Sequence, residues 1–463
     1  MLSVRARVGA SLVLGVALTL FLLPGIVRSG SGRLEPAVEP ARRSTARRGL
    51  VRPRPGLASQ ADFRAGAALA RQPWVKAPSS TDARDGLGPL YEARSCLGCH
   101  VGGGRGTAAD DDAPAGRVVR ISRPTESAGH PPDPTSGPVP DPTYGLQLQT
   151  RSTDVRARFG VEGARIPAEV LLEWGRIEAR VAGRWLPRPE LAVRSWRYGP
   201  PAPDLQIGLR AAPSLLGLGA LAAVPDRALL EAADPEDEDG DGISGRVNRV
   251  WDPEQGRRVV GRFGWKANSP TLRAQIASAL SEDMGLTSPP RPSPPCTERQ
   301  RACREEPSGG VPEVPEARFA LLVAFVEGLD RPSPGRLPGD AAARGRRLFA
   351  EVGCAACHRP SLPTPNGPVF AFTDLLLHDL GPGLADGRPD FEASGSEWRT
   401  APLWGIGENQ ALDRRVRLLH DGRARSVEEA ILWHGGEAAE SRARYLSRSP
   451  AERRRLIDYV RSR

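Results

Sequence analysis

The pattern Cys-x-x-Cys-His occurs twice in this chain, and it constrains the fold more than any other feature. The two copies lie in the segments SCLGCHVGG and GCAACHRPS, and they use four of the six cysteines: Cys96, Cys99, Cys354 and Cys357. In each copy two thiols three positions apart lie on one face of a helical turn, and His100 or His358 follows directly. The chain must therefore build two sites around the same local motif.

This spacing is the attachment signature of c-type haem. The two thiols can add to the two vinyl groups of one porphyrin, while the adjacent imidazole ligates the iron. We therefore predict two covalently bound haem c groups, with His100 and His358 as proximal iron ligands. The competing interpretation is one zinc ion held by all four thiolates. The long separation of the copies and the histidine in each argue against zinc.

The chain is long enough for two or three hydrophobic cores. Its 51 Gly and 46 Pro predict many loops. We expect a mainly α fold with loop-rich segments, a few short strands and two cytochrome c-like haem domains. The first domain is predicted at 61–330, with a β and loop insertion and an interdomain segment, and the second at 337–463. Helices are expected near 260–285 and in the segments PEARFALLVAFVEGLD, SVEEAILWH and SPAERRRLIDYVRS.

Residues 1–29 have the pattern of a signal peptide or an N-terminal anchor. Arg5 and Arg7 precede an apolar run from Ala10 to Leu23, which Pro24 follows. With its flanks this run is long enough to cross a bilayer. Both interpretations place the rest of the chain in the periplasm, either free or anchored to the inner membrane. Residues 30–60 are rich in Arg and Pro and are predicted to be a disordered linker.

The net charge of +9 could indicate a nucleic-acid partner. Lys occurs only at positions 76 and 266, so nearly all the positive charge is Arg. No basic stripe interleaved with aromatic residues stands out. We therefore predict no nucleic-acid partner.

Two cysteines remain outside the motifs, in the segment PPCTERQRACREE. In an oxidising compartment Cys296 and Cys303 are predicted to form a local disulfide. Its expected role is a staple on a proline-rich loop.

The reactivity of each haem depends on the second axial position of its iron. His434 follows a well-capped helix and is our predicted distal ligand of the second haem, with His420 and His378 as competitors. Only His130, in a proline-rich loop, lies near the first motif. We therefore expect the first iron to keep an open face for chemistry, with ligation by His130 as the alternative.

The chain resembles the bacterial di-haem oxidoreductases described as peroxidases, sometimes called thiol oxidoreductases. The segments GRFGWKANSPTLRAQIASALSEDMGLTS, FTDLLLHDLGPGLADGR, EWRTAPLWGIG and LHDGRARSVEEAILWHGGEA carry the resemblance, which covers about 85–463. This family is a distant relative of the di-haem cytochrome c peroxidases. In those enzymes the distal ligand at the position of His434 is usually Met. A His here implies a lower potential and puts the usual high-potential cytochrome donor in doubt.

The resemblance also implies catalytic residues. Trp265 matches a tryptophan between the haems, and Gln275 matches a glutamine of the peroxide pocket. The acid of that pocket is displaced by about two positions, so Asp283 or Glu282 is its expected equivalent. The alternatives are a core role for Trp265 and a solvated helix face for Gln275 and Asp283.

The segment DPEDEDGDGISGR resembles the first half of a calcium loop. Asp237, Asp239 and Asp241 alternate and Gly242 follows, but Asn248 stands where a bidentate Glu is expected. Calcium binding and a solvated acidic turn both remain open.

Together these patterns predict a periplasmic di-haem oxidoreductase that reduces hydrogen peroxide at the first haem. Electrons are expected from a redox partner protein or a quinone-linked donor, through the second haem. One alternative is an electron-transfer cytochrome without a substrate, which requires two closed irons. The other is a haem-dependent oxygenase that uses dioxygen, which an apolar pocket beside the first haem would favour.

Overall fold

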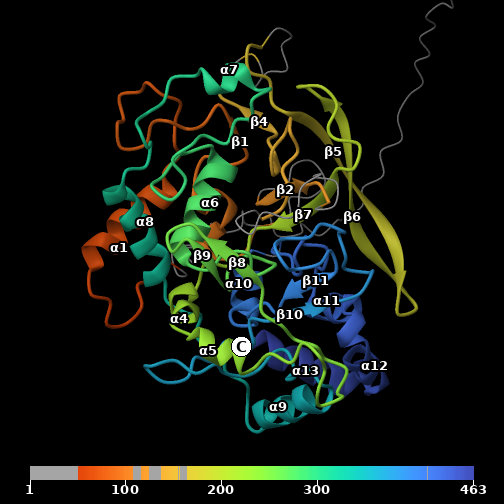
Figure 1. Cartoon of the computed structure of the whole chain (residues 1–463). Helices are drawn as coiled ribbons and strands as arrows, with labels where there is room; N and C mark the ends of the chain where they lie inside the picture. Colours follow the sequence, from red (N-terminus) through yellow and green to blue (C-terminus); the bar gives the residue numbers. More distant parts are fainter. Residues whose placement is uncertain (1–50, 108–115, 125–136, 155, 157–163, 414) are drawn as a thin grey trace, which may run out of the picture. The chain divides into compact units, whose positions relative to one another are not determined.

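The computed structural model describes residues 51–107, 116–124, 137–154, 156, 164–413 and 415–463 (Figure 1). The signal or anchor segment 1–29, most of the predicted linker and His130 lie outside the described residues. Among the described residues, 28% are helical and 20% lie in strands. All of them belong to one compact unit, Thr45–Arg463. No described helix is both long enough and apolar enough to cross a membrane.

The helices of the first part of the chain surround the first motif. They are α1 (Gln60–Arg71), α2 (Cys96–Cys99), η2 (Val101–Gly103), α4 (Leu218–Ala222), α5 (Asp226–Leu230), α6 (Leu272–Met284), α7 (Arg301–Arg304) and α8 (Glu316–Gly328). Helices α1 and α8 pack closely at Gly66, where a Cβ atom would lie 2.0 Å from the carbonyl oxygen of Leu321. These two helices, with α6, contribute to the largest hydrophobic core, which includes Phe63, Leu280 and Phe325.

The helices of the second part surround the second motif. They are α9 (Ala341–Glu351), α10 (Ile406–Leu412), α11 (Val427–Trp433), η4 (Gly436–Ala438), α12 (Ala439–Ser447) and α13 (Pro450–Arg461). Phe349 of α9, Val427 of α11 and Tyr459 of α13 belong to a second core. The first core also takes in Leu362 and Leu376, which follow the second motif. The two parts therefore share buried side chains.

The described strands form one three-stranded sheet, of order β3–β2–β7, and four antiparallel pairs. Their bounds are β1 (Leu90–Tyr91), β2 (Arg117–Ser122), β3 (Gln147–Leu148), β4 (Arg151–Ser152), β5 (Val170–Val181), β6 (Arg184–Trp196), β7 (Gln206–Ala211), β8 (Arg249–Asp252), β9 (Arg257–Val260), β10 (Leu377–Asp379) and β11 (Glu397–Arg399).

Strands β5 and β6 form a long hairpin, although the sequence predicts only short strands in this region. They have 12 and 13 residues and are joined by Ala182 and Gly183, which have φ angles of 48° and 77°. Two central residues with positive φ match the right-handed twist of the flanking strands, so a tight turn extends the pairing.

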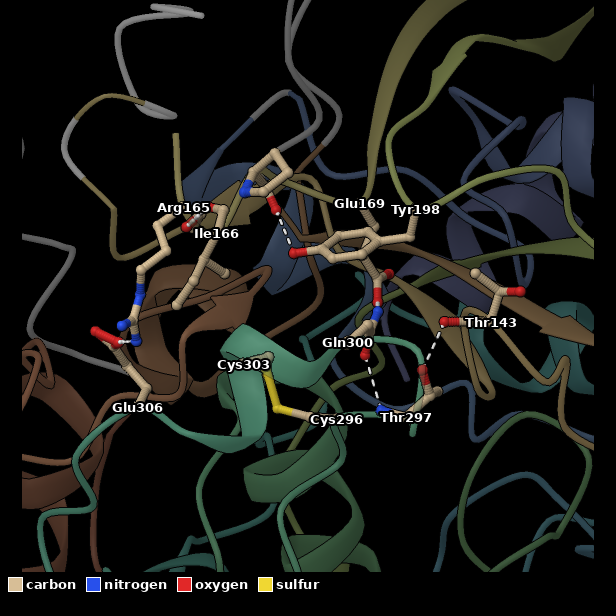
Figure 2. The surroundings of a disulfide bond; sticks show 12 residues. Thr143, Arg165, Ile166, Glu169, Tyr198, Cys296, Thr297, Gln300, Cys303 and Glu306 are labelled. Carbon is tan, nitrogen blue, oxygen red and sulfur yellow. Dashed lines mark hydrogen bonds and ion pairs between the residues drawn. A yellow bond between two sulfur atoms is a disulfide. The ribbon is translucent and has the colours of Figure 1, made fainter. Parts of the chain in front are cut away.

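A disulfide bond joins Cys296 to Cys303 in the segment around α7 (Figure 2). Thr297 Oγ1 donates to the carbonyl of Thr143 at 2.8 Å, and the Gln300 side chain donates to the carboxylate of the buried Glu169. The disulfide thus fixes a loop that contacts both the β3 region and the base of the hairpin.

Candidate functional site

The first motif faces a cavity of about 540 Å³, whose lining includes Cys96, Cys99 and His100. Both cysteines are free of disulfide bonds. The His100 Nδ1 atom lies 2.7 Å from the carbonyl oxygen of Pro213, which selects the tautomer with the proton on Nδ1. Burial lowers the pKa of His100, so the imidazole is neutral at pH 7. Nε2 is then the nitrogen able to bind a metal.

The second motif has two histidines of the same kind. His358 Nδ1 lies 3.0 Å from the carbonyl oxygen of Phe372, and His434 Nδ1 lies 2.6 Å from that of Ala430. Burial lowers the pKa of both, and that of His358 falls to about 4. His434 and His378 both contribute to the lowering for His358 through their charges. His358 and His434 thus share the neutral form with Nδ1 bonded to a backbone carbonyl, which leaves Nε2 to bind a metal. That both ligate the second haem stays a prediction.

The competing histidines are engaged differently. His378 places Nδ1 2.7 Å from Glu437 Oε2 and Nε2 2.9 Å from Asp374 Oδ2. Burial opposes its protonation, but the hydrogen bonds of these carboxylates and of Cys357 outweigh burial and raise the pKa of His378 to about 12. Carboxylates thus engage both ring nitrogens, and Asp374 and His378 form with Cys357 a group of ligand atoms within 4.8 Å of one another. The ring of His420 stacks on Trp398 with centroids 3.6 Å apart.

The four motif cysteines do not form one metal site. Within the described parts of the chain, no cluster of three or more nearby ligand atoms unites Cys96 and Cys99 with Cys354 and Cys357. The zinc interpretation is therefore unsupported.

Helix α6 presents polar side chains to the cavity of the first motif. Gln275, Glu282 and Asp283 all line it, because positions seven and eight apart return to the same helix face. Gln275 Oε1 and Asp283 Oδ1 are buried, and neither makes a hydrogen bond within the described structure, although Asp283 Oδ1 has an ion pair with Arg120 at 3.6 Å. Buried polar atoms normally have hydrogen-bond partners. Both atoms can therefore accept a hydrogen bond from a molecule inside the cavity.

Cationic side chains line the same cavity, among them Arg105, Arg210, Lys266 and Arg388. Trp265 is buried beside them and donates from Nε1 to the carbonyl of Ala211 at 2.7 Å. Arg210 pairs with Asp386 at 2.5 Å, yet its Nη2 atom has no hydrogen-bond partner in the described structure. Such guanidinium groups suit the carboxylates of a bound cofactor.

Glu92, near this cavity, should make stability depend on pH. Burial raises its pKa from 4.5 to about 7, although Thr150 donates from both N and Oγ1 to the carboxylate. A carboxyl whose pKa is higher in the folded state than in the unfolded state stabilises the fold fully below the unfolded value of 4.5. This stabilisation is lost as the pH rises through the folded value of about 7. Glu92→Gln can keep both hydrogen bonds without the charge. We expect the free energy of unfolding of this variant to exceed that of the parent by about 2 kcal/mol at pH 8 and to equal it at pH 4.

Urea unfolding of the holoprotein at both pH values measures this difference. Glu190→Gln, on the exposed face of β6, is the control and should behave as the parent at both. An equal gain for Glu92→Gln at pH 4 and pH 8 would contradict the assignment.

The acidic loop forms a different cluster from the one predicted. Carboxylate oxygens of Asp234, Asp237 and Asp239 lie within 4.8 Å of one another, and Asp241 lies outside the group. Asp237 instead accepts from the backbone N–H of Gly242 at 3.0 Å. Asp234 precedes the alternating acids, so the calcium-loop pattern, which begins at Asp237, does not include it. Calcium binding here stays a prediction.

Two partly buried cysteine–histidine motifs lie in one compact unit, and the first borders a cavity lined by cations and the polar face of α6, an arrangement that fits a protein with two redox centres. The family model "Di-haem oxidoreductase, putative peroxidase" matches residues 201–463, and the chain belongs to this family. This result confirms the resemblance, and membership implies two haems and a general oxidoreductase or peroxidase role.

Other comparisons add little. No curated protein matches the chain. One solved structure that matches is Kuenenia stuttgartiensis hydrazine synthase pressurised with 20 bar xenon, at 19% identity over 32% of this chain. The match spans 55% of that protein's chain, and its TM-score of 0.22 is too low to support any structural conclusion.

Proposed function

We propose that this chain is an exported c-type di-haem peroxidase that reduces hydrogen peroxide at the first motif. Cys96, Cys99 and His100 hold the haem at which peroxide binds. The other haem is held by Cys354, Cys357, His358 and His434. The observation that carries the proposal is the difference between the two centres. The first shares its cavity with the polar face of α6, whereas for the second His434 offers a further neutral imidazole whose Nδ1 is bonded to the carbonyl of Ala430.

The described residues fit such a cofactor. Each motif places two free thiols beside a histidine whose Nδ1 is fixed by a backbone carbonyl. The cavity volume lies within the range of cofactor sites. The unpartnered Arg210 Nη2 offers a donor for a propionate group.

The overall reaction consumes two electrons and two protons for each peroxide and yields two waters. The haem supplies one-electron chemistry and a Lewis-acidic iron. Gln275 hydrogen-bonds the bound peroxide and orients it. Asp283 accepts a proton from one peroxide oxygen and returns it to the other, which then leaves as water.

The cavity lining is mixed. Apolar groups make up its larger part, which suits the organic substrate of an oxygenase, whereas its cations and the polar face of α6 suit a small polar oxidant. Arg105, Arg120, Arg210, Lys266 and Arg388 all border the cavity. The proposal includes export by the segment 1–29 and electrons from a redox partner protein or a quinone-linked donor.

Electron paramagnetic resonance of the oxidised holoprotein, combined with optical titration with peroxide, tests the proposal. We expect one high-spin and one low-spin haem, with only the high-spin signal responding to peroxide. If both haems are low-spin and neither signal responds to peroxide, the proposal is wrong and the protein is an electron-transfer cytochrome.

A further inference from the structure

A buried cluster of tryptophans lies between the cavity of the first motif and the distal histidine of the second. This tryptophan cluster consists of Leu186, Trp265, Leu384, Trp398, Leu432 and Trp433. Trp265 lines the cavity, and Trp433 directly precedes His434. Its three tryptophans are at most 8% exposed. The cluster thus has one end at each centre.

Hydrogen bonds and a ring stack connect the first two tryptophans. Trp265 Nε1 donates to the carbonyl of Ala211 at 2.7 Å, and the N–H of Ala211 donates to the carbonyl of His420 at 2.6 Å. The ring of His420 then lies flat on Trp398, with centroids 3.6 Å apart and planes 7° apart. Electron tunnelling decays less along hydrogen bonds and stacked rings than across gaps, so this sequence of contacts couples the two indoles.

Packing alone does not explain the choice of tryptophan. The Nε1 atoms of Trp398 and Trp433 are buried and have no hydrogen-bond partner in the described structure. A buried donor without a partner costs about 1–3 kcal/mol. A phenylalanine would avoid that cost, so these indole N–H groups, like Arg210 Nη2, point to a partner that the described chain does not supply.

Cations limit what Trp398 can do. Lys266 Nζ lies 4.1 Å and the Arg210 guanidinium 4.7 Å from its ring centroid. Burial lowers the pKa of Lys266 to about 7, so Arg210 carries most of the positive charge at this ring. Adjacent positive charge stabilises the neutral ring and opposes the removal of an electron from it. Trp398 is therefore suited to bridge the centres without itself becoming an oxidised radical.

We propose that Ala211, His420, Trp398 and Trp433 extend Trp265 into an electron route that joins the two haem centres on the His434 side. The proposal rests on the proposed function, because it requires two haems that exchange electrons. Each transfer moves one electron from the second centre to the oxidised first centre and breaks no bond. The electrons come from the external donor of the proposed reaction.

The test measures electron exchange between the haems, without peroxide. Carbon monoxide is photolysed from the half-reduced holoprotein, and the redistribution of the electron is followed in the visible bands. We expect Trp398→Leu to slow this redistribution severalfold or more and Trp398→Phe to slow it less. The optical spectra and midpoint potentials of both haems should stay as in the parent. No tryptophan radical should appear in paramagnetic resonance.

Trp196→Phe is the matched control, because Trp196 packs on Tyr144 in a different aromatic pair and does not line the cavity of the first motif. Its rate should equal that of the parent. An unchanged rate in Trp398→Leu overturns the route and leaves the proposed function standing. If Trp398→Leu does not incorporate both haems, Trp398→Phe and Trp433→Phe test the route instead. Exchange rates equal to that of the parent in both variants would overturn the route. A parent that shows no exchange at all contradicts the proposed function.

Discussion

Asp283→Asn is expected to lower kcat/KM for hydrogen peroxide by about a hundredfold or more, because it removes the group that moves the proton. The substitution keeps the shape of the side chain. The backbone carbonyl of Asp283, which accepts from the N–H groups of Glu92 and Ala93 at 2.9 Å, is unaffected. The first motif and its cavity should therefore stay intact. Steady-state kinetics with the holoprotein, together with its high-spin signal, check this result.

Glu282 is the matched comparison, because it is the other acid at this end of α6. It is 8% exposed and forms ion pairs with Arg120 and, at 3.3 Å, with Arg291. Asp283 has a single looser ion pair, 3.6 Å from Arg120. A carboxylate held by two guanidinium groups is poorly placed to accept and release a proton. Glu282→Gln should therefore cost much less activity, and the reverse order would assign the catalytic acid to Glu282.

The features that the sequence predicts correctly are mainly helices and the side chains that share one helix face. The helix around Gln275 and Asp283 puts both side chains on one face, and this face does line the cavity of the first motif. The helix predicted in SVEEAILWH is α11, and His434 stands at its C-terminal end. These positions depend on helix geometry, which a single sequence contains.

Contacts between distant segments are not visible in that pattern. The carbonyl oxygens of Pro213 and Phe372, which fix His100 and His358, belong to backbone groups that every residue has. The clamp of His378 joins Asp374 to Glu437 across the second part of the chain. No spacing rule identifies such partners. Only the three-dimensional arrangement separates the clamped histidine from the ligand.

Helix α11 begins with only one of the two hydrogen bonds of a capping box. Ser426 accepts from the N–H of Glu429 at 3.1 Å, which is the first half of a capping box. The Glu429 carboxylate turns to Arg425, which donates from its backbone N–H at 2.8 Å and from its side chain. A neighbouring arginine thus takes the second half of the motif. The helix start is still fixed, and with it the position of His434.

His434→Met is expected to raise the midpoint potential of one haem by roughly 0.1 V or more, since axial ligands set haem potentials over a range of about 0.8 V. His434 is prepared as a ligand by its position: it ends α11, and its Nδ1 bonds to Ala430 one turn earlier. His434→Ala, which offers no replacement ligand, should convert the low-spin signal to high-spin and open a second carbon monoxide site. Redox titration and paramagnetic resonance of the two variants measure these changes.

His420→Phe is the control for this assignment. Phe can keep the stack on Trp398 but cannot ligate iron, so the low-spin signal and the potential of the second haem should match the parent. If His420→Phe abolishes the low-spin signal and His434→Ala leaves it intact, His420 is the distal ligand. The geometry argues against that outcome, because the ring of His420 is stacked on the face of Trp398, whereas the Nδ1 of His434 is held by the carbonyl of Ala430 and leaves Nε2 available.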